Sequence, residues 1–193
     1  MYDYHTILGA SAVVLVFIGY WFYLGSVFRG QTKPHPFTWL LFLVLDVTIF
    51  IAQVKNNGGL GAWAMGVGTL FATVVFLFAL RQGWKDIKTL DWLCLALALI
   101  AIAAWNVTGN ALYAVALAAL ADAIAKVPTI RKSYIRPDEE SLSIWSFDML
   151  RFSLSIAALS SIGWITALFP AEIVVTNAVV VATILIRRRQ LRI

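Results

Sequence analysis

Residues Thr6–Phe28 read TILGASAVVLVFIGYWFYLGSVF and contain no charged side chain. About 20 apolar residues in a helix cover the roughly 30 Å of a bilayer's hydrocarbon core. We therefore predict a membrane-spanning helix near Ile7–Leu24. The residues before it include Asp3 and no Lys or Arg, and the run exceeds the usual signal-peptide core of about 7–15 residues, so we predict a retained helix.

The rest of the chain has the same character. Of its 193 residues, 61% are hydrophobic and 13% are charged, whereas soluble proteins average roughly 45–50% and about 25%. Mean hydropathy is +0.84. We predict an all-α, polytopic membrane protein whose first partner is the lipid bilayer, with no room for a soluble domain.

The later apolar runs predict six further crossings, which makes seven. Two runs are too long for one helix, and we predict breaks at the polar cluster Asn106–Asn110 and at Gly163–Glu172 around Pro170. The charged segment Thr129–Ser141 is predicted to be an aqueous connector. The later spans are predicted at Phe37–Val54, within Asn56–Leu80, at Trp92–Trp105, at Ala111–Val127, and twice within Leu142–Ile186.

The basic residues orient these spans. If the amino terminus is outside, almost all of the 15 Lys and Arg residues fall on the inner side, as the positive-inside rule requires. We predict a cell (inner) membrane protein with a cytoplasmic carboxyl terminus, and we attribute the net charge of +5 to orientation rather than to nucleic-acid binding. The inner residues are Arg29, Lys33, Arg81, Lys85, Lys88, Arg131, Lys132, Arg136, Arg187, Arg188, Arg189 and Arg192.

Two inner connectors resemble each other: RGQTKPHPFTW at 29–39 and RKSYIRPDEESLSIW at 131–145. In each, basic residues leave a helix, a Pro follows, and a Thr or Ser precedes a Trp at the start of the next helix. The third and seventh spans share Ala72-Thr73 and Ala182-Thr183. Spans one to three and five to seven are therefore predicted to be parallel repeats, related by an axis along the membrane normal.

In topology and length the chain resembles a divergent member of the PQ-loop and SWEET transporter superfamily. Pro128-Thr129 stands where the second Pro-Gln dipeptide of that superfamily would be, followed by basic residues and by Glu140-Ser141-Leu142-Ser143. The first bundle departs from the pattern, with Tyr23 and Leu24 near the expected Pro.

This resemblance implies two three-helix bundles joined by a linker helix: residues 1–80, then an inner loop and linker at 81–109, then 110–193 with a basic cytoplasmic tail. It implies a carrier that moves a small polar solute, such as a sugar, amino acid or vitamin, by alternating access. The alternative is a non-transporting receptor or assembly subunit that uses the same fold to bind a ligand. Homo-oligomer formation stays open.

Ionisable residues at membrane depth are costly and mark candidate sites. Asp46 lies inside the second span, and Asp148 and Arg151 lie inside the sixth. Aligning Thr38 with Ser143 places Asp46 opposite Arg151 in the repeat, which predicts an Asp46–Arg151 or Asp148–Arg151 pair lining a central path. The alternative is structural: Asp148 and Arg151, at i and i+3, pair within one helix.

Asp122 and Lys126 lie at i and i+4 in the fifth span, just before Pro128. A buried carboxylate beside a proline hinge would couple a proton to a rocking motion, so these three residues are the proton-coupling or hinge candidates. In the alternative, Lys126 extends to the inner interface and Asp122 is only its partner.

Asn177 lies near the middle of the seventh span, and the resemblance implies a substrate contact for it. A structural amide bonded to a neighbouring helix is the alternative. Tyr20, Trp21 and Tyr23 are candidates to face a cavity. Gly61, Gly66 and Gly68 are predicted to permit close helix packing.

Enzyme chemistry finds little support in the sequence. His5 and His35 are the only histidines, and both lie in or near aqueous ends. No metalloprotease, phosphate-loop or nucleotide-binding pattern occurs. We predict no enzymatic activity, no cofactor and no metal.

Overall fold

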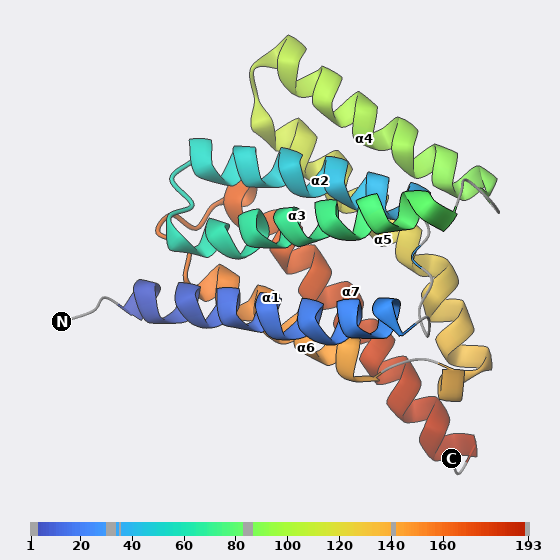
Figure 1. Ribbon diagram of the computed structural model, residues 1–193. Helices are drawn as coiled ribbons and strands as arrows, with labels where there is room; N and C mark the ends of the chain where they lie inside the picture. The colour runs from blue at the N-terminus through green and yellow to red at the C-terminus, as the bar shows by residue number, and fades with distance from the viewer. Residues whose placement is uncertain (1–3, 30–33, 35, 83–86, 140–141, 192–193) are drawn as a thin grey trace.

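The computed structural model describes residues 4–29, 34, 36–82, 87–139 and 142–191, and these residues form helices joined by short turns, with no strand among them. This confirms the predicted all-α class (Figure 1). Short 3-10 turns lie at Leu80–Gln82 (η1) and Pro137–Glu139 (η2). The α-helices are α1 (Tyr4–Phe28), α2 (Pro36–Lys55), α3 (Leu60–Ala79), α4 (Thr89–Thr108), α5 (Ala111–Ile135), α6 (Leu142–Ala157) and α7 (Trp164–Leu191).

Six of these helices, all except α6, are long and apolar enough to cross a membrane. α6 has 16 residues, which corresponds to about 24 Å and falls short of a full hydrocarbon core. The helix that holds Asp148 and Arg151 is therefore the one whose crossing does not follow from length and composition.

The distribution of polarity fits a lipid environment. Large apolar side chains lie on the outside, among them Trp21 at 79% and Leu70 at 68% exposed. The buried residues include polar ones, such as Gln53, Thr166 and Asn177. An apolar exterior around polar interior groups is the arrangement that a bilayer favours, because buried polar groups must find partners inside the protein.

α3 and α7 each lie between two other helices. α3 packs between α1 and α2, and α7 packs between α5 and α6 (Figure 1). α1 also lies along α6, while α2 contacts α5 and α7. α4 packs mainly against α5, and its buried residues are the small Cys94, Ala98 and Ala101, which allow a close approach of two helices.

At one end of the bundle, the turn between α2 and α3 is bonded to the end of α6 and the turn after it. The N–H of Gly61 donates to the Ala158 carbonyl at 3.2 Å, and the N–H of Ser160 donates to the Gly58 carbonyl at 3.3 Å. The Ser155 hydroxyl donates to the Gly61 carbonyl at 2.7 Å. We call these five residues the turn latch.

Glycine makes the turn latch possible. A Cβ at Gly61 would lie 2.5 Å from the Ser155 carbonyl oxygen, and one at Gly66 would lie 2.7 Å from the Phe50 ring. The predicted packing role of these two glycines is therefore confirmed.

The break predicted at Gly163–Glu172 is wrong. α6 ends at Ala157, α7 begins at Trp164, and Pro170 lies inside α7. A proline cannot donate to the carbonyl four residues earlier, which is that of Thr166. The Gln53 side-chain amide of α2 donates to this carbonyl at 2.7 Å, so the missing bond is replaced and the helix continues.

The predicted end of the fifth span at Val127 is also wrong. α5 continues through Pro128 to Ile135, so the start of the predicted connector is helical. Pro128 removes one backbone hydrogen bond of α5, and the helix continues past it. α5 ends at Ile135, two residues before Pro137 begins η2. The turn predicted at Asn106–Asn110 is confirmed, since α4 ends at Thr108 and Gly109 adopts φ 66°.

Candidate functional site

Five of the predicted candidates lie together inside the bundle, and we call them the central polar cluster: Tyr20 of α1, Asp46 of α2, Asp148 and Arg151 of α6, and Asn177 of α7. Arg151 Nη2 lies 2.6 Å from Asp148 Oδ1. Asn177 Nδ2 donates to Asp148 Oδ2 at 3.1 Å.

Arg151 is the centre of this cluster. Its guanidinium interacts electrostatically with Asp46 and Tyr20 as well as with Asp148, and it lies over the Phe152 ring at 4.2 Å. The direct ion pair is the i, i+3 pair with Asp148, as the structural alternative predicts, while Asp46 acts on the same guanidinium from a different helix.

Gly68 of α3 gives Arg151 its space. A Cβ at Gly68 would lie 3.2 Å from Arg151 Nη1, so any other residue there would press on the guanidinium. The sequence predicts a packing role for Gly68, and the structure shows that its neighbour is a charged side chain rather than a helix backbone.

Two buried polar atoms of the cluster lack hydrogen-bond partners among the described residues. They are the acceptor Asn177 Oδ1 and the donor Arg151 Nε. Asn177 is completely buried. Since most buried polar atoms in folded proteins are satisfied, these two mark the cluster as unusual.

The two aromatic candidates of α1 differ. Tyr20, a member of the cluster, stacks its ring on Phe71 of α3 with centroids 4.9 Å apart. Trp21 is 79% exposed and is not brought into the cluster. Tyr23 packs against Trp39, with ring centroids 5.2 Å apart.

A second charged group lies between α5 and α7, and we call it the α5–α7 ion cluster: Asp122, Lys126, Glu172 and Thr176. Lys126 Nζ contacts Asp122 Oδ2, lies 3.9 Å from Glu172 Oε1, and donates to Thr176 Oγ1 at 2.9 Å. The side chains of Lys126 and Glu172 are 12% exposed and that of Asp122 is 8% exposed. The ammonium of Lys126 is therefore held among side chains of α5 and α7.

The sequence does not single out Glu172, Thr176 or Gln53 as site residues. Glu172 was assigned to the predicted break around Pro170, although its charge within an apolar run was a usable signal. Gln53 carries no comparable signal, because its partner is a backbone carbonyl 113 residues away. Pro128 lies inside α5, two residues after Lys126.

Within the ranges that the structure describes, no group of three or more His, Cys, Asp or Glu side chains is placed to hold a metal ion. His35 and residues 30–33 of the first inner connector lie outside those ranges, as do Glu140 and Ser141 of the second. The charged groups that the structure brings together are thus the two clusters above.

Six apolar helices around buried charged groups indicate a multi-pass α-helical membrane protein. No protein-family model, curated protein or solved structure matches this chain.

Proposed function

We propose that this protein is an integral membrane carrier that moves a small polar solute by alternating access between two three-helix bundles. In this proposal α6 also crosses the membrane, residues 1–80 and 110–193 form the bundles, and 81–109 form the loop and linker helix. Membership of a divergent branch of the PQ-loop and SWEET superfamily is part of the same proposal.

The packing supports two equivalent bundles. In the proposed repeat, α1 corresponds to α5, α2 to α6 and α3 to α7. Within each set the third helix packs between the first two: α3 between α1 and α2, and α7 between α5 and α6. The contacts between the two sets correspond as well. The contact of α1 with α6 matches that of α5 with α2, and the contact of α3 with α6 matches that of α7 with α2. Such a relation is the expected result of parallel repeats.

One observation carries the proposal: the central polar cluster lies where the two bundles meet. Tyr20 and Asp46 come from the first bundle, and Asp148, Arg151 and Asn177 come from the second. Charged groups inside a membrane protein are expensive and serve function by default. A polar solute at this position would satisfy the two buried atoms, Asn177 Oδ1 and Arg151 Nε, that lack partners.

The turn latch supports alternating access. It joins the α2–α3 turn of the first bundle to the α6–α7 region of the second. A carrier needs one end closed while the other is open, and the latch closes the end that holds the amino terminus of α1 (Figure 1). With the basic end in the cytoplasm, the latched end faces outward.

The α5–α7 ion cluster is the proposed proton-coupling element. Two carboxylates, Asp122 and Glu172, share the single ammonium of Lys126, so one of them has room for a proton. The other groups that act on Asp122 are Cys94 of α4 and Asp46 of α2, and Thr176 bonds Lys126 from α7. Asp122→Asn should remove the pH dependence of uptake if a proton is coupled, and should lower only expression or thermal stability if the cluster is structural.

The function is tested with purified protein. Thermal-shift screening over sugars, amino acids, vitamins and nucleosides identifies a ligand, and flux into liposomes then shows whether it is transported. Binding without flux would favour the receptor or assembly subunit over the carrier.

The cross-bundle role of the cluster is tested by a charge swap. Asp46→Arg and Arg151→Asp should each abolish flux, and the double variant should restore part of it if the two residues act on each other across the bundles. Failure of the double variant at normal levels of folded protein would refute the cross-bundle interaction.

A further inference from the structure

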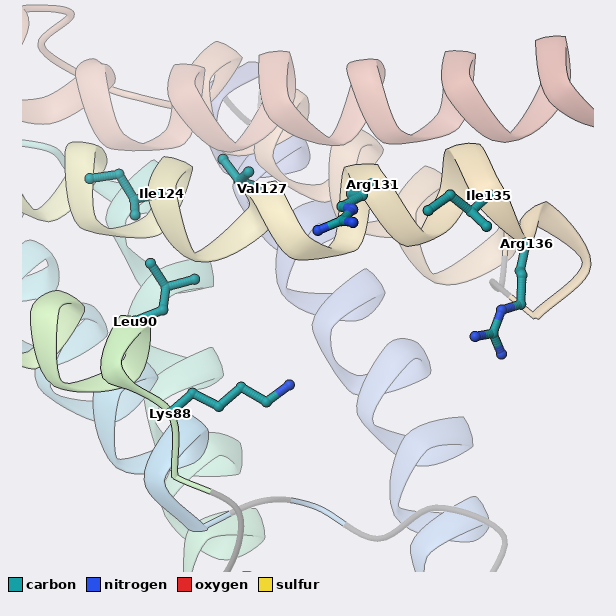
Figure 2. A pocket seen from close by; sticks show the side chains of 7 residues that line it. All are labelled: Lys88, Leu90, Ile124, Val127, Arg131, Ile135 and Arg136. Atoms are coloured by element: carbon teal, nitrogen blue, oxygen red, sulfur yellow. The ribbon is translucent and has the colours of Figure 1, made fainter.

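A cavity of about 640 Å³ lies between the start of α4 and the last turns of α5 (Figure 2). It is separate from both charged clusters, which face α7 and the bundle centre. Three basic residues line it: Lys88 from the position before α4, Arg131 from α5, and Arg136 from just beyond α5. Among the described residues that line the cavity, none is acidic.

The remaining wall of the cavity is apolar. Leu90 comes from α4, and Ile124, Val127 and Ile135 come from α5. Residues at 124, 127, 131 and 135 follow helical spacing and share one face of α5, as Figure 2 shows. Val127 is 58% exposed and Ile135 is 56% exposed, although they lie beside charged groups.

The cavity has a polar level and an apolar level. Lys88 and Arg136 lie at helix ends, where the chain leaves the bundle, while Ile124 and Val127 lie farther along α5 toward its middle. With the basic end in the cytoplasm, as proposed above, Lys88 and Arg136 would stand at the height of lipid headgroups, and Ile124 and Val127 would stand at the height of acyl chains. A free anion would contact the basic residues and would leave the apolar residues of the cavity without a ligand contact.

We propose that this cavity binds an anionic phospholipid of the cytoplasmic leaflet. Its phosphate lies among Lys88, Arg131 and Arg136, and an acyl chain lies along Ile124, Val127 and Leu90. Basic pockets between helices on the cytoplasmic side attract anionic headgroups electrostatically. The exposed apolar wall of the cavity contacts the acyl chain of the lipid. The site does not depend on whether the protein transports a solute.

The test measures lipid binding to the full-length protein in a neutral detergent. Phosphatidylglycerol and phosphatidylcholine with identical acyl chains are titrated, and bound lipid is counted by native mass spectrometry. Phosphatidylglycerol should bind more tightly. The double variant Lys88→Gln/Arg131→Gln should weaken its binding by about fivefold per charge, or about 25-fold in all.

The matched control removes two charges from the same end of the protein without touching the cavity. Arg81→Gln/Arg189→Gln should leave phosphatidylglycerol binding unchanged, because neither residue lines the cavity. An equal loss in this control, or equal binding of the two lipids by the unaltered protein, would overturn the proposal.

A second comparison separates a lipid from a soluble anion. Val127→Ser keeps every charge and should weaken phosphatidylglycerol binding, with the thermal unfolding temperature showing that the variant is folded. Glycerol 3-phosphate is titrated in parallel. If it binds as tightly as the lipid, the cavity is a site for soluble phosphates and the lipid proposal is wrong.

Discussion

The two charged clusters of this protein differ in what they connect. The central polar cluster draws side chains from α1, α2, α6 and α7, yet its direct ion pair, Asp148 with Arg151, lies within one helix. The α5–α7 ion cluster involves only two helices, and Lys126 of α5 reaches Glu172 and Thr176 of α7.

Their burial differs as well. Asp148 keeps 34% of its side chain exposed, whereas Asp122 keeps 8%. A charge that is nearly buried is more costly to leave without its partner than one that is partly exposed. We therefore expect the α5–α7 ion cluster to govern stability and the central polar cluster to govern activity.

The largest effect is expected from Lys126→Met. It leaves Asp122 and Glu172 buried without a cation, and breaking a buried ion pair costs about 3–5 kcal/mol of unfolding free energy. Equilibrium unfolding in mixed detergent micelles measures this loss. The control is Lys55→Met, which removes an exposed lysine that makes a cation–π contact with Trp105 and should cost about 1 kcal/mol or less. Equal losses of unfolding free energy in the two variants would show that the burial of Lys126 does not matter for stability.

A smaller effect of opposite sign is expected when Glu172→Gln is added to Lys126→Met. The second change removes one of the two unpaired carboxylates, so the double variant should regain roughly 1–2 kcal/mol. The same unfolding experiment gives this coupling. A double variant less stable than Lys126→Met alone would show that Glu172 is not held by the lysine.

Asp148→Asn should cost stability by about 1–2 kcal/mol, because it removes a charged partner of Arg151 that is only partly buried. Its effect on flux should be greater: at equal amounts of folded protein, transport should fall at every pH. Asp138→Asn, in η2 and exposed, is the matched control and should leave both quantities unchanged. Normal flux in Asp148→Asn would separate the central polar cluster from activity.

The smallest effect is expected from Gly68→Ala. The added Cβ would lie 3.2 Å from Arg151 Nη1, so the guanidinium must shift, at a cost of about 1 kcal/mol or less. Gly19→Ala is the control, because nothing lies within 4 Å of its Cβ and alanine favours a helix by up to about 1 kcal/mol. Thermal unfolding and solute affinity measure both; the same stabilisation in the two variants would show that Gly68 does not confine Arg151.

The sequence predicts the parts of this fold that depend on composition and short spacing. Apolar runs predict the helices, the Asn106–Asn110 cluster predicts a turn, and the i, i+3 and i, i+4 spacings predict the Asp148–Arg151 and Asp122–Lys126 pairs. All of these are local properties, so the residues that cause them lie close together in the chain.

The errors concern interactions between distant residues. Pro170 was assigned to a helix break because the sequence does not show that Gln53 replaces its lost bond. A break at that proline places Glu172 in a loop. The sequence therefore does not predict that Glu172 belongs to the α5–α7 ion cluster. Gly68 has no side chain whose polarity could indicate its neighbour. Only the structure shows that Arg151 lies beside it.

The bond between Gln53 and the Thr166 carbonyl also has a consequence for motion. A proline-containing turn leaves an acceptor that the helix itself cannot use, and the side chain of Gln53 from α2 donates to it. Thr166 lies in the first turn of α7, beside the turn latch. In the proposed carrier, separation of α2 from α7 would leave that acceptor to water, while the other backbone bonds of α7 would persist. The contact is therefore one side-chain hydrogen bond that joins α2 to α7 without being part of the backbone ladder of either helix.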